Sequence, residues 1–174
     1  MKKNFKYKRI IILGGSGSGK STLANRISRY TGYPIYHLDN LFLDSNWKTK
    51  SREEREEISK QFLFKDIGVV DGNYTSSIPQ RINWADLIIF IDISTRAHLY
   101  RIFKRMFKII LGLEKRHGKP QNSKNIVNLI FIKWVYFWNK HRRNEVLLLL
   151  ESAKDKKVVI IKEPRKLDLE KLFK

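Results

Sequence analysis

The chain has 174 residues, with 36 Lys and Arg against 17 Asp and Glu, so its formal net charge is +19 at pH 7. This length suits one domain, residues 1–174, that buries roughly two thirds of its unfolded surface. The absence of cysteine excludes disulfides, thiolate metal sites and a cysteine nucleophile. The sequence contains neither a signal peptide nor an apolar stretch of the ~20 residues that span a bilayer. We therefore expect a cytoplasmic protein that does not enter a membrane.

The positive charge is unevenly distributed, because residues 96–143 hold 13 Lys and Arg but only one acidic residue. Such asymmetry indicates an anionic partner, and the charge alone leaves open nucleotide phosphates, nucleic acid or a membrane surface. A lysine-rich bias spread over solvated faces is the other explanation. The histidines show no metal-ligand spacing, so we expect them at the surface or in packing: His37, His98, His117 and His141.

The first predicted elements are a strand at Arg9–Leu13 and a helix at Ser21–Tyr30, joined by the sequence GGSGSGK. Together with Ser21, this sequence matches the P-loop pattern G-x-x-x-x-G-K-[ST] in full. A dinucleotide-binding G-x-G-x-x-G fingerprint that begins at Gly15 would need glycine in place of Lys20, so that alternative fails. The predicted ligand is therefore the phosphate chain of a nucleotide.

Each type of residue in this loop has a physical task. The glycines let consecutive backbone N–H groups point into one concavity, and the helix N-terminus adds partial positive charge. Lys20 is placed to reach the outer phosphates, and Ser21 to offer its hydroxyl to Mg²⁺. We expect the nucleotide to contact Gly14, Gly15, Ser16, Gly17, Ser18, Gly19, Lys20, Ser21 and Thr22.

The rest of the chain alternates predicted strands with predicted helices. Short apolar runs of this kind are typical of a parallel sheet that is buried on both faces. The further strands are predicted at residues 35–37, 68–70, 87–91 and 157–161. Their alternation with helices predicts a three-layer α/β domain.

Capping signals and apolar patterning mark several of the helices. Ser51 and Glu54 form a capping box ahead of a helix that runs to Lys65. Asp92, which directly follows a strand, or Ser94 is expected to cap the next helix, and capping is the role assigned to Asp92. A later segment, 125–141, is apolar on most sides, so we expect its aromatic residues mainly in the core: Trp134, Tyr136, Phe137 and Trp138.

Two further carboxylates follow predicted strands, where ligands collect in open α/β sheets. Asp71, in VVDGNY, suits a carboxylate that holds Mg²⁺ through water opposite Ser21; a turn aspartate beside Gly72 is the alternative. Asp39, in YHLD, is a candidate to orient a substrate hydroxyl or accept its proton; a helix-capping aspartate is the alternative.

Arginines supply a second set of candidates. Arg101 and Arg105 lie four residues apart, so they share one face of a predicted helix on the nucleotide side. Arg81 lies ten residues beyond Asp71, on the acceptor side. Guanidinium groups bind phosphoryl oxygens in a bidentate manner and neutralise charge that develops during transfer.

Nearly the whole chain resembles the P-loop kinases known as DNA topology modulation protein, FlaR-like, which are similar to adenylate kinase. The matching stretches are GGSGSGKSTLA at 14–24, YHLD at 36–39, VVDGNY at 69–74, WADLIIFID at 84–92, YRIFKR at 100–105 and KW…RR at 133–143. The resemblance implies a parallel five-stranded sheet of order 2-3-1-4-5 in a P-loop fold of the nucleoside- and nucleotide-kinase type. It also implies ATP with Mg²⁺ as the phosphoryl donor.

The comparison with adenylate kinase implies roles on the nucleotide side. Arg101 corresponds to an arginine that stacks on adenine, and Arg105 to one that touches the phosphates. A short basic lid is implied at about residues 112–125. Arg142 or Arg143, at the far end of the next helix, is expected to return to the phosphates.

The same comparison implies roles on the acceptor side. Asp71 corresponds to the aspartate beside Mg²⁺ in a similar DG segment of adenylate kinase. The arginine of that segment, which grips the acceptor phosphate, is replaced here by Thr75, and Arg81 is the expected substitute. The candidate substrate-binding residues are therefore Asp39, Asp71, Arg81, Arg142 and Arg143, and the candidate catalytic residues are Lys20, Asp39, Arg101 and Arg105.

Two functions remain open. The first is an ATP- and Mg²⁺-dependent kinase, monomer or homodimer, that phosphorylates a nucleoside, nucleotide or polar metabolite. The second is a nucleic-acid-associated regulator that uses ATP as a switching ligand, supported by the basic segment 96–143. A GTPase is disfavoured because the chain lacks an N-K-x-D guanine-reading motif.

Overall fold

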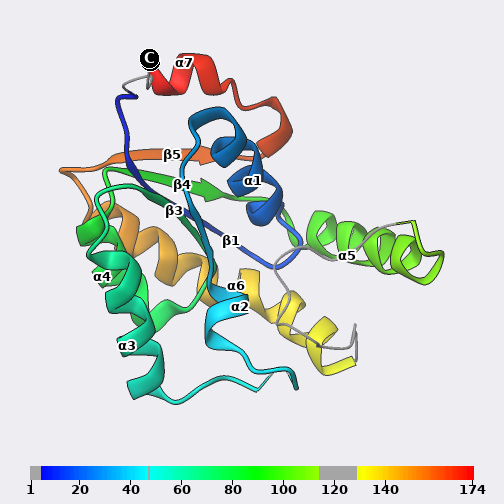
Figure 1. Ribbon diagram of the computed structural model, residues 1–174. Coiled ribbons are helices and arrows are strands. Elements are labelled where there is room, and N and C mark those ends of the chain that lie inside the picture. The colour runs from blue at the N-terminus through cyan, green and yellow to red at the C-terminus, as the bar shows by residue number, and fades with distance from the viewer. Residues whose placement is uncertain (1–4, 47, 114–128) are drawn as a thin grey trace.

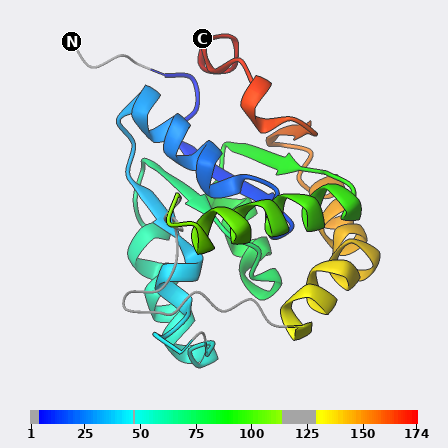
Figure 2. The same cartoon turned by 90° about the vertical axis from the view of Figure 1, so that its right-hand side faces the viewer.

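A computed structural model describes residues 5–46, 48–113 and 129–174, and Figures 1 and 2 show its ribbon. Most of the predicted lid, residues 114–125, lies outside the described residues. Five strands alternate with helices along the chain. In order, the elements are β1 (Arg9–Gly14), α1 (Lys20–Thr31), β2 (Ile35–His37), α2 (Leu38–Phe42), α3 (Arg52–Leu63), β3 (Gly68–Asp71), η1 (Thr75–Ser77), α4 (Ile78–Trp84), β4 (Leu87–Ile91), α5 (Thr95–Ile110), α6 (Leu129–Glu151), β5 (Lys157–Ile161), η2 (Pro164–Lys166) and α7 (Leu169–Phe173).

The strands form one parallel sheet in the order β2-β3-β1-β4-β5, as predicted. Helices cover both of its faces, which gives the three layers visible in Figure 1. In β1, Ile10 and Ile12 pack with α1 and α7, whereas Ile11 and Leu13 pack with α2, α3, α4 and α6. All four side chains are fully buried because the central strand has a layer of helices on each side.

The register of the sheet brings the carboxyl ends of its central strands together. His37 of β2 lies opposite Asp71 of β3, which in turn lies opposite Ile12 of β1. On the other side, Gly14 lies opposite Ile91 of β4. The residues that follow these strands therefore lie together beyond the carboxyl ends of the strands, where ligands bind in open α/β folds.

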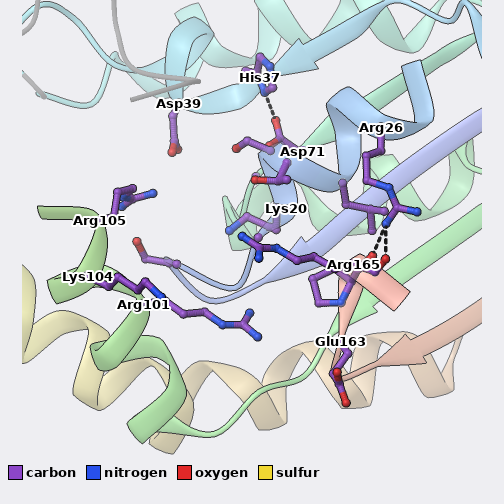
Figure 3. Close-up of a pocket in the computed structure, with 18 of the residues that line it drawn as sticks. Lys20, Arg26, His37, Asp39, Asp71, Arg101, Lys104, Arg105, Glu163 and Arg165 are labelled. Atoms are coloured by element: carbon purple, nitrogen blue, oxygen red, sulfur yellow. Dashed lines mark hydrogen bonds and ion pairs between the residues drawn. The ribbon is translucent and has the colours of Figure 1, made fainter. Parts of the chain in front are cut away.

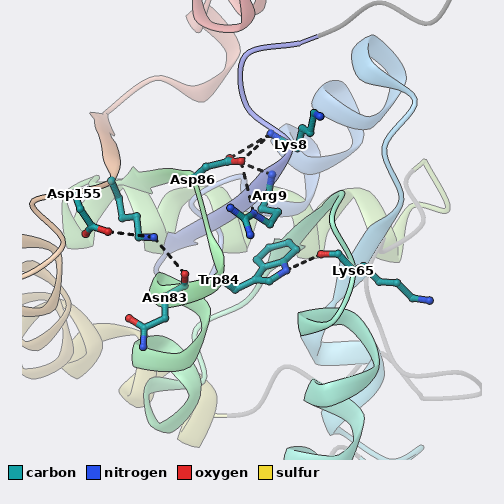
Figure 4. Close-up of polar contacts among 8 residues, drawn as sticks. Lys8, Arg9, Lys65, Asn83, Trp84, Asp86 and Asp155 are labelled. Carbon is teal, nitrogen blue, oxygen red and sulfur yellow. Dashed lines mark hydrogen bonds and ion pairs between the residues drawn. The ribbon is translucent and has the colours of Figure 1, made fainter.

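At the opposite end of the sheet, where the strands begin, polar contacts hold the chain segments together, as Figure 4 shows. The Asp86 carboxylate accepts hydrogen bonds from the backbone N–H groups of Lys8, at 3.1 Å, and Arg9, at 3.0 Å. The indole Nε1 of Trp84 donates to the Lys65 carbonyl at 2.8 Å. These contacts join the segments that lead into β1, β3 and β4. The amino ends of the strands therefore stabilise the fold, whereas the carboxyl ends carry the candidate site.

The helix predictions were confirmed in part. Ser51 and Glu54 form the predicted capping box of α3. Of the two predicted caps of α5, Ser94 is confirmed, because its hydroxyl accepts a hydrogen bond from the Ala97 N–H at 3.3 Å, and the capping role assigned to Asp92 is wrong. The structure places Asp92 before the cap because the helix begins only at Thr95.

Helix α6 differs from the prediction in length and burial. It extends to Glu151, ten residues beyond the predicted end. Trp138 is buried as expected, but Tyr136 is 55% exposed and Phe137 48%, because only one side of this part of the helix faces the sheet and α5. The side chain of Trp134 is outside the described part. None of the helices described is both long enough and apolar enough to cross a bilayer.

Candidate phosphate-binding and acceptor site

The P-loop joins β1 to α1 at the carboxyl ends of the strands. Gly17 and Gly19 have φ angles of 76° and 102°, values that side chains other than glycine rarely adopt. Gly19 is the N-cap of α1 and offers no side-chain cap, and the first turn of α1 contains no acidic residue. In the described part of the chain, no side chain caps the N-terminus of this helix, which suits the predicted binding of anionic oxygens there.

Helix α5 supports the P-loop from its buried side. The Nδ1 atom of His98 lies 2.8 Å from the Ser16 carbonyl, and Nη1 of Arg101 donates to the Ser18 carbonyl at 2.8 Å. A Cβ atom at Gly15 would lie 2.5 Å from the His98 ring, so only glycine allows this close packing. His98 is buried, as expected for a packing histidine.

The P-loop borders a cavity of about 450 Å³. Its walls come from the loop, the first turns of α1, the ends of β2 and β3, helix α5 and the segment after β5. The lining residues are Ser16, Gly17, Gly19, Lys20, Ser21, Thr22, Leu23, Arg26, His37, Asp39, Asp71, Gly72, Tyr100, Arg101, Lys104, Arg105, Lys108, Glu163, Pro164 and Arg165. Gly14, Gly15 and Ser18, which were also predicted to contact the nucleotide, are buried and are not among these lining residues.

Lys20 lies at the centre of the cavity in Figure 3. Its Nζ atom donates to the Gly15 carbonyl at 3.0 Å. Burial lowers the pKa of Lys20 below its usual value, while the carboxylates of Asp39 and Asp71 oppose that shift and Arg105 adds to it. The ammonium group can exchange its bond to the loop for a phosphate oxygen without leaving the cavity.

Asp71, which is buried, and His37, which is partly buried, form a pair at the ends of β3 and β2. Nδ1 of His37 lies 2.6 Å from Oδ1 of Asp71, and Asp71 is 3% exposed. This hydrogen bond raises the pKa of His37, and burial opposes the rise. The pairing was not predicted, because His37 was expected only as a surface or packing residue. Its position next to Asp39 in YHLD was the available signal.

Asp39 lies at the start of α2 and points into the cavity, on the side facing Arg105 in Figure 3. Its neighbour Tyr74 is largely buried. Burial and the Asp39 carboxylate raise the pKa of Tyr74 far above its usual range, and a hydrogen bond between the two side chains contributes. The Tyr74 phenol therefore stays protonated and restrains the Asp39 carboxylate.

The residues present fit a Mg²⁺ ion that arrives with a nucleotide. The Ser21 hydroxyl and the Asp71 and Asp39 carboxylates line one cavity, and Mg²⁺ prefers such hard oxygen ligands. Over residues 5–46, 48–113 and 129–174, no three His, Asp or Glu side chains group as ligands of a resident metal. The donor set is small, which matches an ion that takes further ligands from phosphates and water.

The structure places the predicted arginines in two groups. Arg101 and Arg105 line the cavity. Arg81, Arg142 and Arg143 do not, so their predicted contacts with substrate are not supported by their positions. Arg142 pairs with Glu145 on the exposed surface of α6, at 2.9 Å.

Arg81 is fully buried beneath the β3–α4 connection. Its Nη1, Nη2 and Nε atoms donate to the carbonyls of Gly72, Tyr74 and Ser77 at 2.9, 3.0 and 3.3 Å. Burial lowers the pKa of Arg81, and the Asp71 carboxylate opposes this. Its donors thus shape the connection instead of reaching the cavity.

Arg143 is bound to Asp92 instead of phosphate. Its Nε and Nη2 atoms donate to the two Asp92 carboxylate oxygens at 2.7 and 2.8 Å, an arrangement that joins α6 to the end of β4. This contact lowers the pKa of Asp92, and burial opposes the shift. The pair therefore stabilises the fold above the pKa of the unfolded chain and loses that effect as the pH falls through the lowered pKa.

We expect a matching pH dependence of stability. The difference in unfolding free energy between the wild type and Asp92→Asn should shrink as the pH falls from about 5 to about 3. Urea titrations at each pH measure it, with the exposed Asp66→Asn variant as the control. A difference that stays constant over this range would contradict the stabilising role of the ion pair.

Several cavity residues were missed by the sequence predictions. Lys104 and Lys108 follow Arg101 at spacings of three and seven, so they share its helix face, a pattern that was available in the sequence. Arg26 on α1 donates to the carbonyls of Pro164, at 2.6 Å, and Leu167, at 2.9 Å. These bonds hold the segment after β5 against the P-loop, a contact that no local motif reveals.

Comparison with known proteins adds information about the fold. No protein-family model matches the chain, and no curated protein matches it. Among solved structures, deoxyadenosine kinase from M. mycoides with bound dATP is 16% identical, with a TM-score of 0.53 and coverage of 94% of each chain. The chain has a P-loop kinase fold. A gluconokinase from Sinorhizobium meliloti 1021 is 19% identical, with a TM-score of 0.43 and coverage of 82% of this chain and 97% of its own.

This P-loop kinase fold accounts for the position of the cavity at the carboxyl ends of the strands. Fold alone does not determine function, so the chemistry has to be inferred from the residues of the site.

Proposed function

We propose that this protein is an ATP- and Mg²⁺-dependent phosphotransferase that acts on a small-molecule acceptor. One observation carries the proposal: a single cavity joins a complete P-loop with Lys20 to a wall that contains the carboxylates Asp39 and Asp71. A phosphoryl donor on the loop and an acceptor against that wall would lie within one shared space. In such reactions catalysis is almost entirely positioning and neutralisation of charge.

The residues divide this work. The N–H groups at the start of α1 and the Lys20 ammonium bind the triphosphate, and Arg101 and Arg105 neutralise charge from α5. Ser21 and Asp71 hold Mg²⁺, which when bound withdraws charge from the phosphate oxygens. Asp39 orients the acceptor from the opposite wall.

We also propose, on its sequence motifs, that the chain belongs to the DNA topology modulation, FlaR-like group of P-loop kinases. The support is the set of stretches around the P-loop, YHLD and VVDGNY. Of these, His37, Asp39 and Asp71 meet in the cavity, which gives the motifs a common location.

A second candidate function is supported by the surface of α5. Tyr100, Phe103 and Phe107 are 65%, 43% and 63% exposed. Lys104 lies over the Tyr100 ring, 5.8 Å from its centroid. Exposed aromatic residues beside cations are typical of surfaces that bind single-stranded nucleic acid.

Calorimetry and a salt titration separate the two candidates. A kinase should bind Mg·ATP with measurable heat and should release ADP in the presence of an acceptor. Absence of heat at millimolar Mg·ATP would contradict the proposal. A nucleic-acid regulator should bind single-stranded DNA or RNA at physiological salt with a steep salt dependence, and negligible binding would remove that candidate.

A further inference from the structure

The two walls of the cavity differ in charge and in hydrogen-bonding character, as Figure 3 shows. The described basic side chains that line it come from α1, α5 and the segment after β5: Lys20, Arg26, Arg101, Lys104, Arg105, Lys108 and Arg165. The wall from β2, α2 and β3 contributes instead His37, Asp39, Asp71 and Gly72. This acceptor wall, as we name these four residues, is rich in hydrogen-bond acceptors.

A phosphate group on the acceptor would need cationic donors of the lysine or arginine type, which the four residues of this wall do not include. The Gly72 N–H already donates to the Ile12 carbonyl, at 3.4 Å. Arg81, the arginine expected to grip an acceptor phosphate, uses three nitrogen atoms on backbone carbonyls and is fully buried. Releasing it would break three hydrogen bonds in a buried site, which is costly.

Arg55 is the other arginine near this wall, and it is also engaged. Its Nε atom donates to the Ser51 carbonyl at 3.3 Å, and Nη1 to the Ser76 hydroxyl at 3.5 Å. It is absent from the lining of the cavity. Within the described part of the chain, the acceptor wall therefore has no lysine or arginine side chain that faces a substrate, and its histidine, His37, is bound through Nδ1 to Asp71.

Hydroxyl groups suit this wall because they donate to carboxylates. Asp39 faces the cavity, and the protonated Tyr74 phenol restrains its carboxylate. One oxygen of Asp71 is bound to His37. Asp39 is thus the carboxylate best placed to accept a hydroxyl proton, while a phosphate dianion here would face like charge, which opposes binding.

We propose that the acceptor is an alcohol without an anionic group, and that its hydroxyl receives the phosphoryl group with Asp39 as the base. This inference rests on the proposed kinase function. The hydroxyl oxygen forms a bond to the γ-phosphorus of ATP, and the bond from that phosphorus to the β–γ bridging oxygen breaks. ADP leaves with the electron pair, and the hydroxyl proton passes to the Asp39 carboxylate. The products are ADP and a phosphate monoester.

Matched pairs of acceptors test the inference with the full chain. Each nucleoside, sugar or polyol is supplied beside its own monophosphate, with Mg·ATP at saturation, and mass spectrometry identifies the product. We expect phosphate monoesters from unphosphorylated members, formed at least about 100-fold faster than any product from their phosphorylated partners. A diphosphate product at a comparable rate would overturn the inference and leave the kinase function standing. Transfer to neither member of any pair would overturn both.

The role of Asp39 is tested with Asp39→Asn on the best acceptor. We expect kcat to fall about 100-fold or more, with Mg·ATP affinity by calorimetry unchanged within about threefold. Asp66→Asn makes the same chemical change at an exposed position outside the cavity and should leave both values unaltered. Retention of wild-type kcat by a folded Asp39→Asn variant would overturn the assignment of the base.

Discussion

Replacing Lys20 with alanine is expected to lower kcat/KM for phosphoryl transfer about 1,000-fold while the fold is retained. The ammonium group lies in the centre of the cavity, where burial strengthens its interaction with phosphate oxygens. In the described part of the chain, the hydrogen bond of the Lys20 ammonium group goes to the Gly15 carbonyl. Removing the ammonium group therefore weakens stabilisation of the transition state much more than it lowers the free energy of unfolding. Rates of ADP release and thermal unfolding measure the two effects separately.

Lys60→Ala is the matched control for this variant. Lys60 is an exposed lysine on α3 whose contact is an ion pair with Glu57, outside the cavity. It should leave transfer at the wild-type rate. Wild-type transfer by a folded Lys20→Ala variant would contradict the assignment of the P-loop as the donor site.

Replacing Arg81 with alanine is expected to lower the free energy of unfolding by about 3 kcal/mol or more. Its guanidinium group is fully buried and satisfies the carbonyls of Gly72, Tyr74 and Ser77. The variant would remove one hydrogen bond from each of these carbonyls, of which Tyr74 still accepts from Ser77, and would open a cavity beneath the β3–α4 connection. Urea unfolding monitored by circular dichroism measures the loss.

Two further variants serve as controls for the measurement on Arg81→Ala. Arg52→Ala removes an exposed arginine from α3 and should leave stability unchanged, because surface ion pairs contribute little. Arg81→Lys keeps the charge but not the fork of donors, so it should fall between the alanine variant and the wild type. Normal stability of Arg81→Ala together with a raised KM for the acceptor would instead support the substrate contact that the sequence suggested.

The strands were predicted closely because their signal is local. The predicted bounds of β2, β4 and β5 match the structure, and β1 and β3 each extend one residue further, to Gly14 and Asp71. In a sheet covered on both faces, burial requires continuous apolar runs, and such runs are visible in the sequence. The order of the strands is not local information; it was implied by family resemblance, and the structure confirmed it.

The site was predicted less completely, because its details depend on contacts between distant residues. Asp39, Asp71 and Arg101 line the cavity as expected, since motif spacing and strand ends determine their location. The partners of Arg81 and Arg143 were not predictable in this way. A guanidinium group satisfies carbonyls or a carboxylate as readily as a phosphate, and the sequence does not show which of these lies closer.

Asn73 links the two walls of the cavity. Its side-chain amide accepts a hydrogen bond from the Gly14 N–H, at 3.0 Å, and donates to the Gly14 carbonyl, so it pairs with the P-loop as a strand neighbour would. As long as these two Asn73–Gly14 hydrogen bonds remain, the P-loop and the segment Asp71–Tyr74 have to move together. Under the proposed function, the part of the fold that would hold the triphosphate and the part that would hold the acceptor are therefore directly bonded to each other.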